Sequence, residues 1–159
     1  MSAPAVMVTA DRVTKTGRDS QMACVLFADD DPDIRELAGL LLGHRGHEVV
    51  TAADGDEAIA LLSGMTPDLV ITDLNMPRQD GHAVCAAVRA RPDLRDIPLV
   101  LLTALPLDDQ RVLRASAESS AVPVAKTDIS SLADLADGLV SGAADVIGRP
   151  STAQSRTVA

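Results

Sequence analysis

Six side chains suited to metal or phosphate chemistry stand directly after apolar runs of this sequence. They are Asp29, Asp30, Asp31, Asp73, Thr103 and Lys126. Carboxylates held within a few ångströms of one another repel, and they stay ionised together only when a cation joins them. Mg²⁺ suits such a group because it prefers oxygen ligands in octahedral geometry. The acidic residues therefore predict a magnesium site, provided that the fold brings the ends of these runs together.

The same residue types could serve the transfer of a phosphoryl group. A lysine ammonium is a compact positive charge for a phosphoryl oxygen or a carboxylate. An aspartate beside Mg²⁺ and a lysine can act as a nucleophile toward phosphorus, because carboxylates do form aspartyl phosphates. The cation would then offset the charge that builds up on the transferred group. This combination indicates phosphoryl chemistry but leaves open which aspartate would accept the group.

The elements that must position these side chains alternate along the chain. Apolar runs predict five strands, at Met22–Asp29, Glu48–Ala53, Leu69–Thr72, Leu99–Leu102 and Ala121–Ala125. Periodic segments predict five helices, at Asp31–His44, Gly55–Ser63, His82–Ala90, Leu107–Ala117 and Ser130–Ile147. Asp31 and Asp128 are candidate caps for the first and last of these helices. Strict alternation with near-continuous apolar strands predicts an α/β fold, a doubly wound five-stranded parallel sheet covered by helices on both faces.

That topology explains why the six side chains should meet. Right-handed crossovers place the carboxyl end of every strand on one edge of the sheet. Open α/β sheets bind their ligands along that edge. We expect a single domain over residues 21–148, between flexible tails at 1–20 and 149–159.

Composition excludes several classes of function. The net charge is −9 and both tails are net positive, so the body is strongly acidic and should repel nucleic acid. Phe27 is the only aromatic residue, which argues against stacking on bases. Cys24 and Cys85 form no CxxC motif, and we expect buried, reduced thiols. No signal peptide or membrane-spanning stretch is visible, which predicts a cytoplasmic protein without membrane contact. The three histidines are expected to cap helices or to face solvent.

Four separated motifs, covering about residues 22–148, resemble the receiver domain of two-component response regulators. They are VLFADDDPDIRELAGLLLGHRGHEVVTAADGDEAIALL, PDLVITDLNMPRQDG, IPLVLLTA and the dipeptide AK, in the order and at the spacing of that family. The resemblance implies the flavodoxin-like receiver fold. It also implies that Asp73, within the sequence Asp73-Leu74-Asn75-Met76-Pro77, is the phosphoacceptor.

The resemblance assigns roles to the other matched residues. Asp29 and Asp30 would bind Mg²⁺ together with Asp73 and the backbone carbonyl of Asn75. Thr103 would be the switch hydroxyl, and Ala104 would leave room beside the phosphoryl group. Lys126 would contact the phosphoryl group, and Gly81 matches the turn glycine before the third helix.

Two positions depart from the family pattern. A proline usually follows the family's lysine, whereas Thr127 follows Lys126 here. The family usually carries a tyrosine or phenylalanine three residues before the lysine, and here that place is Pro123. A proline cannot swing between buried and exposed rotamers, so the departures bear on the activation switch and on the approach of the last loop.

The resemblance predicts a phosphorylation-gated signalling module. A histidine kinase or phosphotransfer protein would phosphorylate Asp73, and a downstream protein would bind the face formed by the fourth helix, fifth strand and fifth helix. The chain would have no output domain and would not be an enzyme beyond phosphoryl transfer to Asp73 and hydrolysis from it. The apolar stripe of the last helix is expected to be core, with a homodimer face as the alternative.

Two other functions remain open from the sequence. One is a degenerate receiver that acts through phosphorylation-independent contacts, which Pro123 and Thr127 favour. The other is a phosphatase with an aspartate nucleophile, for which Asp29–Asp31 offers a DxD pattern. Turnover of p-nitrophenyl phosphate would support the phosphatase.

Overall fold

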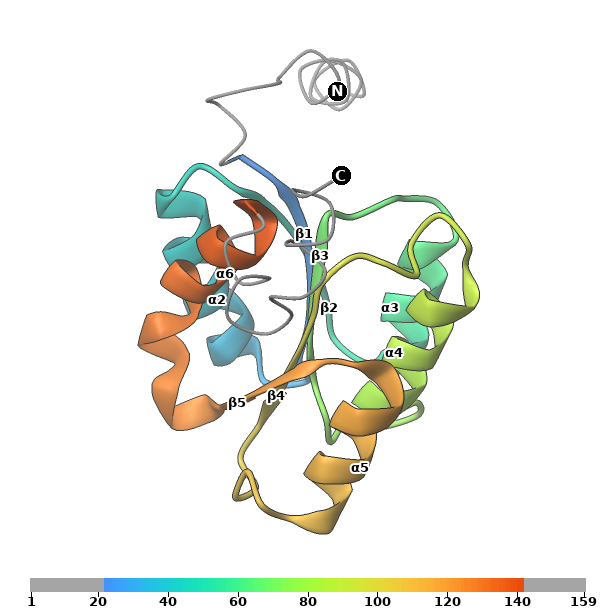
Figure 1. Ribbon diagram of the computed structural model, residues 1–159. Helices are drawn as coiled ribbons and strands as arrows, with labels where there is room; N and C mark the ends of the chain where they lie inside the picture. The colour runs from blue at the N-terminus through green and yellow to red at the C-terminus, as the bar shows by residue number, and fades with distance from the viewer. Residues whose placement is uncertain (1–21, 142–159) are drawn as a thin grey trace, which may run out of the picture.

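A computed structural model describes residues 22–141 of the chain (Figure 1). The strands are β1 (Cys24–Ala28), β2 (Glu48–Ala52), β3 (Leu69–Asp73), β4 (Leu99–Thr103) and β5 (Val122–Ala125). The helices are α2 (Pro32–His44), α3 (Gly55–Leu62), α4 (Gly81–Ala90), α5 (Gln110–Ser119) and α6 (Leu132–Ser141), with a 3₁₀ segment, η2 (Lys126–Ser131), before the last. The predicted tails, residues 1–20 and 149–159, lie outside these residues.

All five strands pair in parallel in one sheet, in the order β2-β1-β3-β4-β5. Helices α2 and α6 cover one face, and α3, α4 and α5 cover the other (Figure 1). Side chains alternate between the faces, so that Phe27 packs under α2 and α6 while Leu26 packs under α3 to α5. This confirms the predicted doubly wound α/β fold.

Aspartates start four of the helices. Asp31, Asp54, Asp80 and Asp109 each accept a backbone N–H of the first turn of α2, α3, α4 or α5. Each cap satisfies a donor that has no partner within the helix, and its negative charge opposes the positive end of the helix dipole. Some of the excess acidic residues are therefore N-caps that stabilise helix starts. Asp31 is the cap that was predicted.

The last helix differs from the prediction at its start. Lys126–Ser131 forms the 3₁₀ segment, and α6 begins at Leu132 rather than at Ser130. Asp128 lies inside the 3₁₀ segment with a non-helical backbone, and does not cap α6. Of the predicted apolar stripe, Leu132 is buried, and Leu135, Leu139 and Val140 are partly buried and pack against the core. The predicted continuation to Ile147 falls outside the described residues.

The prediction for the histidines was wrong for His47, whose side chain is fully buried. Its Nδ1 accepts the N–H of Ala23 at 3.1 Å, and its Nε2 lies 2.6 Å from Asp137 on α6. Arg45 pairs with the same Asp137 and with Asp134. The imidazole therefore ties α6 to the start of β1. A contact across 90 positions leaves no local pattern in the sequence.

No helix among residues 22–141 is long and apolar enough to cross a bilayer.

Candidate functional site

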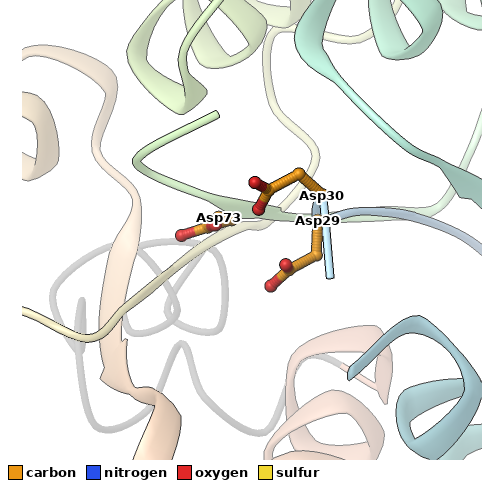
Figure 2. Close-up of side chains that lie close together, drawn as sticks. All are labelled: Asp29, Asp30 and Asp73. Atoms are coloured by element: carbon orange, nitrogen blue, oxygen red, sulfur yellow. The ribbon is translucent and has the colours of Figure 1, made fainter. Parts of the chain in front are cut away.

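The carboxyl ends of β1 and β3 bring three aspartates together. Asp73 is the last residue of β3, and Asp29 and Asp30 directly follow β1, the strand that pairs with it. Figure 2 shows the three carboxylates directed to the same side of the strand ends. One oxygen from each lies within 4.8 Å of the others. This is the predicted acidic cluster.

Lys126 is the first residue after β5, and its side chain reaches the acidic cluster. Its Nζ lies 2.9 Å from Oδ2 of Asp29 and 3.1 Å from Oδ2 of Asp73. Thr127 in place of a proline therefore does not keep the ammonium from the carboxylates. Pro123 lies within β5, an edge strand, where the missing N–H is tolerated.

Burial shapes the electrostatics of the two inner carboxylates. Asp29 is fully buried and Asp73 is 3% exposed, whereas Asp30 is exposed. Burial first, and then the charge of Asp29, raise the pKa of Asp73, while Lys126 and the N–H of Asn75 oppose the rise, and the net result is a pKa of about 6. Burial lowers the pKa of Lys126, but the attraction of its ammonium to the Asp29 and Asp73 carboxylates outweighs that effect, and the net direction is upward. The ammonium thus stays charged, but one lysine cannot balance three carboxylates.

The residues fit a divalent cation. Oδ2 of Asp29 forms an ion pair with Lys126, and this buried oxygen accepts no hydrogen bond within the described residues. Lys126 compensates part of the buried negative charge, but its ammonium is shared with Asp73, and the net negative charge that remains favours a cation. The donor set consists of carboxylate oxygens, with the Asn75 carbonyl in the loop that follows Asp73, which suits Mg²⁺.

Gly81 allows the start of α4 to lie close to the backbone of Asp73. Its N–H donates to the carbonyl of Leu74 at 2.8 Å, and a Cβ at this position would lie 2.2 Å from the carbonyl oxygen of Asp73. The start of α4 therefore packs directly against the backbone of the phosphoacceptor candidate. Only a residue without a side chain allows that approach.

We expect Gly81→Ala to destabilise the protein by about 2 kcal/mol, because backbone atoms must move to admit the methyl group. Urea unfolding followed by circular dichroism measures this loss. Gly39→Ala in α2 is the matched control, since nothing lies within 4 Å of its added Cβ. Equal stability of the two variants would contradict the close packing described here.

Thr103 ends β4, the strand on the other side of β3, where Leu102 is the register partner of Asp73. The side chain is fully buried, and its Oγ1 accepts the N–H of Leu105 at 2.9 Å. The hydroxyl keeps its proton for donation. Ala104 is exposed at the rim. The predicted site residues thus all lie on one edge of the sheet.

The sequence did not identify two contacts that shape the first loop. Arg35 on α2 donates from Nη1 to the carbonyl oxygen of Asp29 at 2.7 Å, and the N–H of Asp31 donates to Oδ1 of Asp29 at 2.9 Å. The only signal for Arg35 was an arginine in the early turns of the helix after the acidic residues. Arginines early in a helix have many other roles, so this one did not predict a contact with the Asp29 carbonyl.

Comparisons with known proteins agree with this geometry. Residues 25–123 match the family model described as the response regulator receiver domain. A probable transcriptional regulator ycf27 of Cyanophora paradoxa is 43% identical over 81 residues, which are 51% of this chain and 33% of the relative. The chain thus spans about a third of the length of that curated relative.

Solved structures show the same similarity. The receiver domain of a signal transduction histidine kinase from Syntrophus aciditrophicus is 35% identical with a TM-score of 0.68, over 76% of this chain and 91% of that one. The response regulator TrrA of Thermotoga maritima, solved in complex with Mg²⁺-BeF, is 30% identical with a TM-score of 0.63, over 73% of this chain and 97% of that one.

Proposed function

Because the chain belongs to the response regulator receiver domain family, we propose that Asp73 accepts a phosphoryl group from a histidine kinase or a histidine phosphotransfer protein. The observation that carries the proposal is the position of Asp73, which lies 3% exposed at the end of β3 beside the Asp29 and Asp30 carboxylates and the Lys126 ammonium. A buried carboxylate with an adjacent fixed cation is placed to attack phosphorus.

In this proposal a carboxylate oxygen of Asp73 forms the new bond to phosphorus, and the bond from phosphorus to the donor breaks. Lys126 lies close enough to both inner carboxylates to move onto an equatorial phosphoryl oxygen, where it would hold part of the developing charge. The Thr103 hydroxyl, on the neighbouring strand, would donate a hydrogen bond to a phosphoryl oxygen. Water then releases phosphate and regenerates the carboxylate, which is the full extent of the chemistry proposed for this chain.

Asp29, Asp30, Asp73 and the Asn75 carbonyl would hold Mg²⁺. When bound, the cation supplies positive charge that offsets the charge on the transferred group. Asp29 contributes the buried oxygen that accepts no hydrogen bond among the described residues, and Asp30 contributes the exposed one. Asp31 is engaged elsewhere, because its carboxylate caps α2. This engagement does not favour a DxD phosphatase.

The proposed output is binding of a downstream protein to the face formed by α5, β5 and α6. Large apolar side chains are exposed on two of these elements, Leu113 of α5 at 49% and Val122 of β5 at 38%. Thr103 ends β4, which precedes α5, and Lys126 follows β5 at the start of η2, which precedes α6. Phosphorylation would therefore change the conformation of this face through Thr103 and Lys126. No rotating aromatic side chain takes part, because position 123 is a proline.

The test is Mg²⁺-dependent labelling with acetyl phosphate, read on a phosphate-affinity gel. We expect a shifted band that is acid-stable and alkali-labile, lost in Asp73→Asn and formed at least tenfold more slowly in Lys126→Ala, since fixed positive charge at the phosphoryl group is worth a few kcal/mol. Asp80→Asn is the control, because asparagine still caps α4. A folded protein that takes no label at any Mg²⁺ concentration would instead support the phosphorylation-independent receiver.

A further inference from the structure

Arg78 holds an unusual backbone conformation in the loop after the phosphoacceptor. Its φ is +69°, and Ser120 is the only other non-glycine residue among positions 22–141 with a positive φ. Ser120 ends a helix, where the left-handed conformation is common. Arg78 has no such reason, and an L residue adopts this region at an energetic cost. Something in the surrounding structure must therefore hold it.

Asp54 is the partner that holds Arg78. Nε of Arg78 lies 3.2 Å from Oδ2 of Asp54, whose other oxygen accepts the N–H of Glu57 and so caps α3. The two loops also touch through their backbones, since a Cβ on Gly55 would lie 1.9 Å from the carbonyl oxygen of Gln79. The loop between β2 and α3 is thus fastened to the loop between β3 and α4.

The fastened loop carries part of the predicted metal site. Residues 74–80, here called the 74–80 loop, follow Asp73 directly and include Asn75, whose N–H donates to Oδ1 of Asp73 at 3.3 Å. Gly81 closes the loop through its hydrogen bond to Leu74. Any shift of the loop's centre would move the Asn75 backbone relative to the carboxylates.

We propose that Arg78 and Asp54 are positioning residues for the metal site, an inference that rests on the proposed function. Their ion pair offsets the cost of the left-handed backbone at Arg78. It thereby keeps the 74–80 loop in the one conformation that presents Asn75 beside Asp73. Neither residue contacts the metal. They act on its affinity through the loop.

The sign of the effect separates positioning from simple electrostatics. Removing a positive charge from the loop that follows Asp73 favours a cation at the acidic site through Coulomb's law. Electrostatics alone therefore predicts that Arg78→Gly binds Mg²⁺ more tightly. Positioning predicts weaker binding, even though glycine relieves the backbone strain.

The experiment measures the Mg²⁺ dissociation constant by calorimetry at physiological ionic strength, together with the urea stability of the metal-free protein. We expect Arg78→Gly and Asp54→Asn each to weaken Mg²⁺ binding roughly twofold to fivefold, the range of a partly exposed ion pair. Asparagine still caps α3, so Asp54→Asn removes the charge and keeps the helix start. The double variant should lose no more than either single one, because both remove the same interaction.

Arg111→Ala is the matched control. It removes an arginine of similar exposure, 66% against 61%, from a different ion pair on α5. Its Mg²⁺ affinity should not fall. Unchanged or tighter binding by Arg78→Gly, or losses that add up in the double variant, would overturn the inference and leave the proposed function intact. Lower stability with unchanged Mg²⁺ affinity would show a merely structural pair. Absence of Mg²⁺ binding by the wild-type protein would overturn both this inference and the proposed metal site.

Discussion

Replacing Asp73 by asparagine is expected to stabilise the metal-free protein by about 3 kcal/mol at pH 7.5, because each unit of pKa shift corresponds to about 1.4 kcal/mol. The pKa of Asp73 rises from 3.8 to about 6 on folding, first through burial and then through the charge of Asp29. The folded protein thus binds the proton more tightly than the unfolded chain. Well above pH 6, Asp73 is ionised in both the folded and the unfolded protein. The cost of burying its charge then destabilises the folded protein by the full amount, and asparagine removes that cost.

The gain should depend on pH in a defined direction. As pH falls from 6 toward 3.8, the folded protein takes up the proton first and the penalty disappears. We expect the advantage of Asp73→Asn to shrink to about 1 kcal/mol at pH 4.5. Urea unfolding in a chelator-containing buffer at both pH values measures it, with Asp96→Asn as an exposed control. A variant that is less stable than wild type at pH 7.5 would contradict the electrostatics described for this site.

Replacing Asp29 by asparagine is expected to weaken Mg²⁺ binding by more than about tenfold, since loss of even an indirect support of a metal site costs that much. Asp29 is fully buried, and its Oδ2 accepts no hydrogen bond among the described residues, so the metal would find no substitute for this oxygen. Mg²⁺ should raise the thermal stability of the wild-type protein, because a ligand that binds only the folded state stabilises it. That increase should be largely lost in Asp29→Asn.

Asp31→Asn provides the matched control for Asp29→Asn. It changes the net charge by the same amount only two positions away, and asparagine caps α2 as well as aspartate does. Its Mg²⁺ affinity should stay within about twofold of wild type, the range of a partly screened charge near the protein surface. Equal loss in both variants would mean that general negative charge, rather than the Asp29 oxygen, attracts the metal.

The site at the sheet edge was predictable because its residues stand at strand ends and also have side chains suited to metal or phosphate chemistry. Asp29, Asp73 and Thr103 each end a strand or directly follow one, and parallel strands must end on the same edge. Alternation of apolar and periodic segments was therefore enough to bring them together. Lys126 followed from the same rule, and its two ion pairs match the expected position.

The contacts that were not predicted join residues with no pattern in common. His47 and Asp137 are 90 positions apart, and Arg78 and Asp54 are 24 apart on loops of irregular backbone. Periodicity describes which face of an element is buried, but not which polar side chain lies opposite. Asp128 shows the related difficulty at a helix start, where a 3₁₀ turn displaced the expected cap.

Chemical mapping of the phosphorylated residue is the direct test of whether Asp73 carries the phosphoryl group. Protein labelled with acetyl phosphate and Mg²⁺ is reduced with borohydride, which converts an aspartyl phosphate to homoserine, and the peptides are sequenced by mass spectrometry. We predict homoserine at position 73, dependent on both Mg²⁺ and acetyl phosphate. Homoserine at position 29 or 30, or a label that survives in Asp73→Asn, would contradict this prediction.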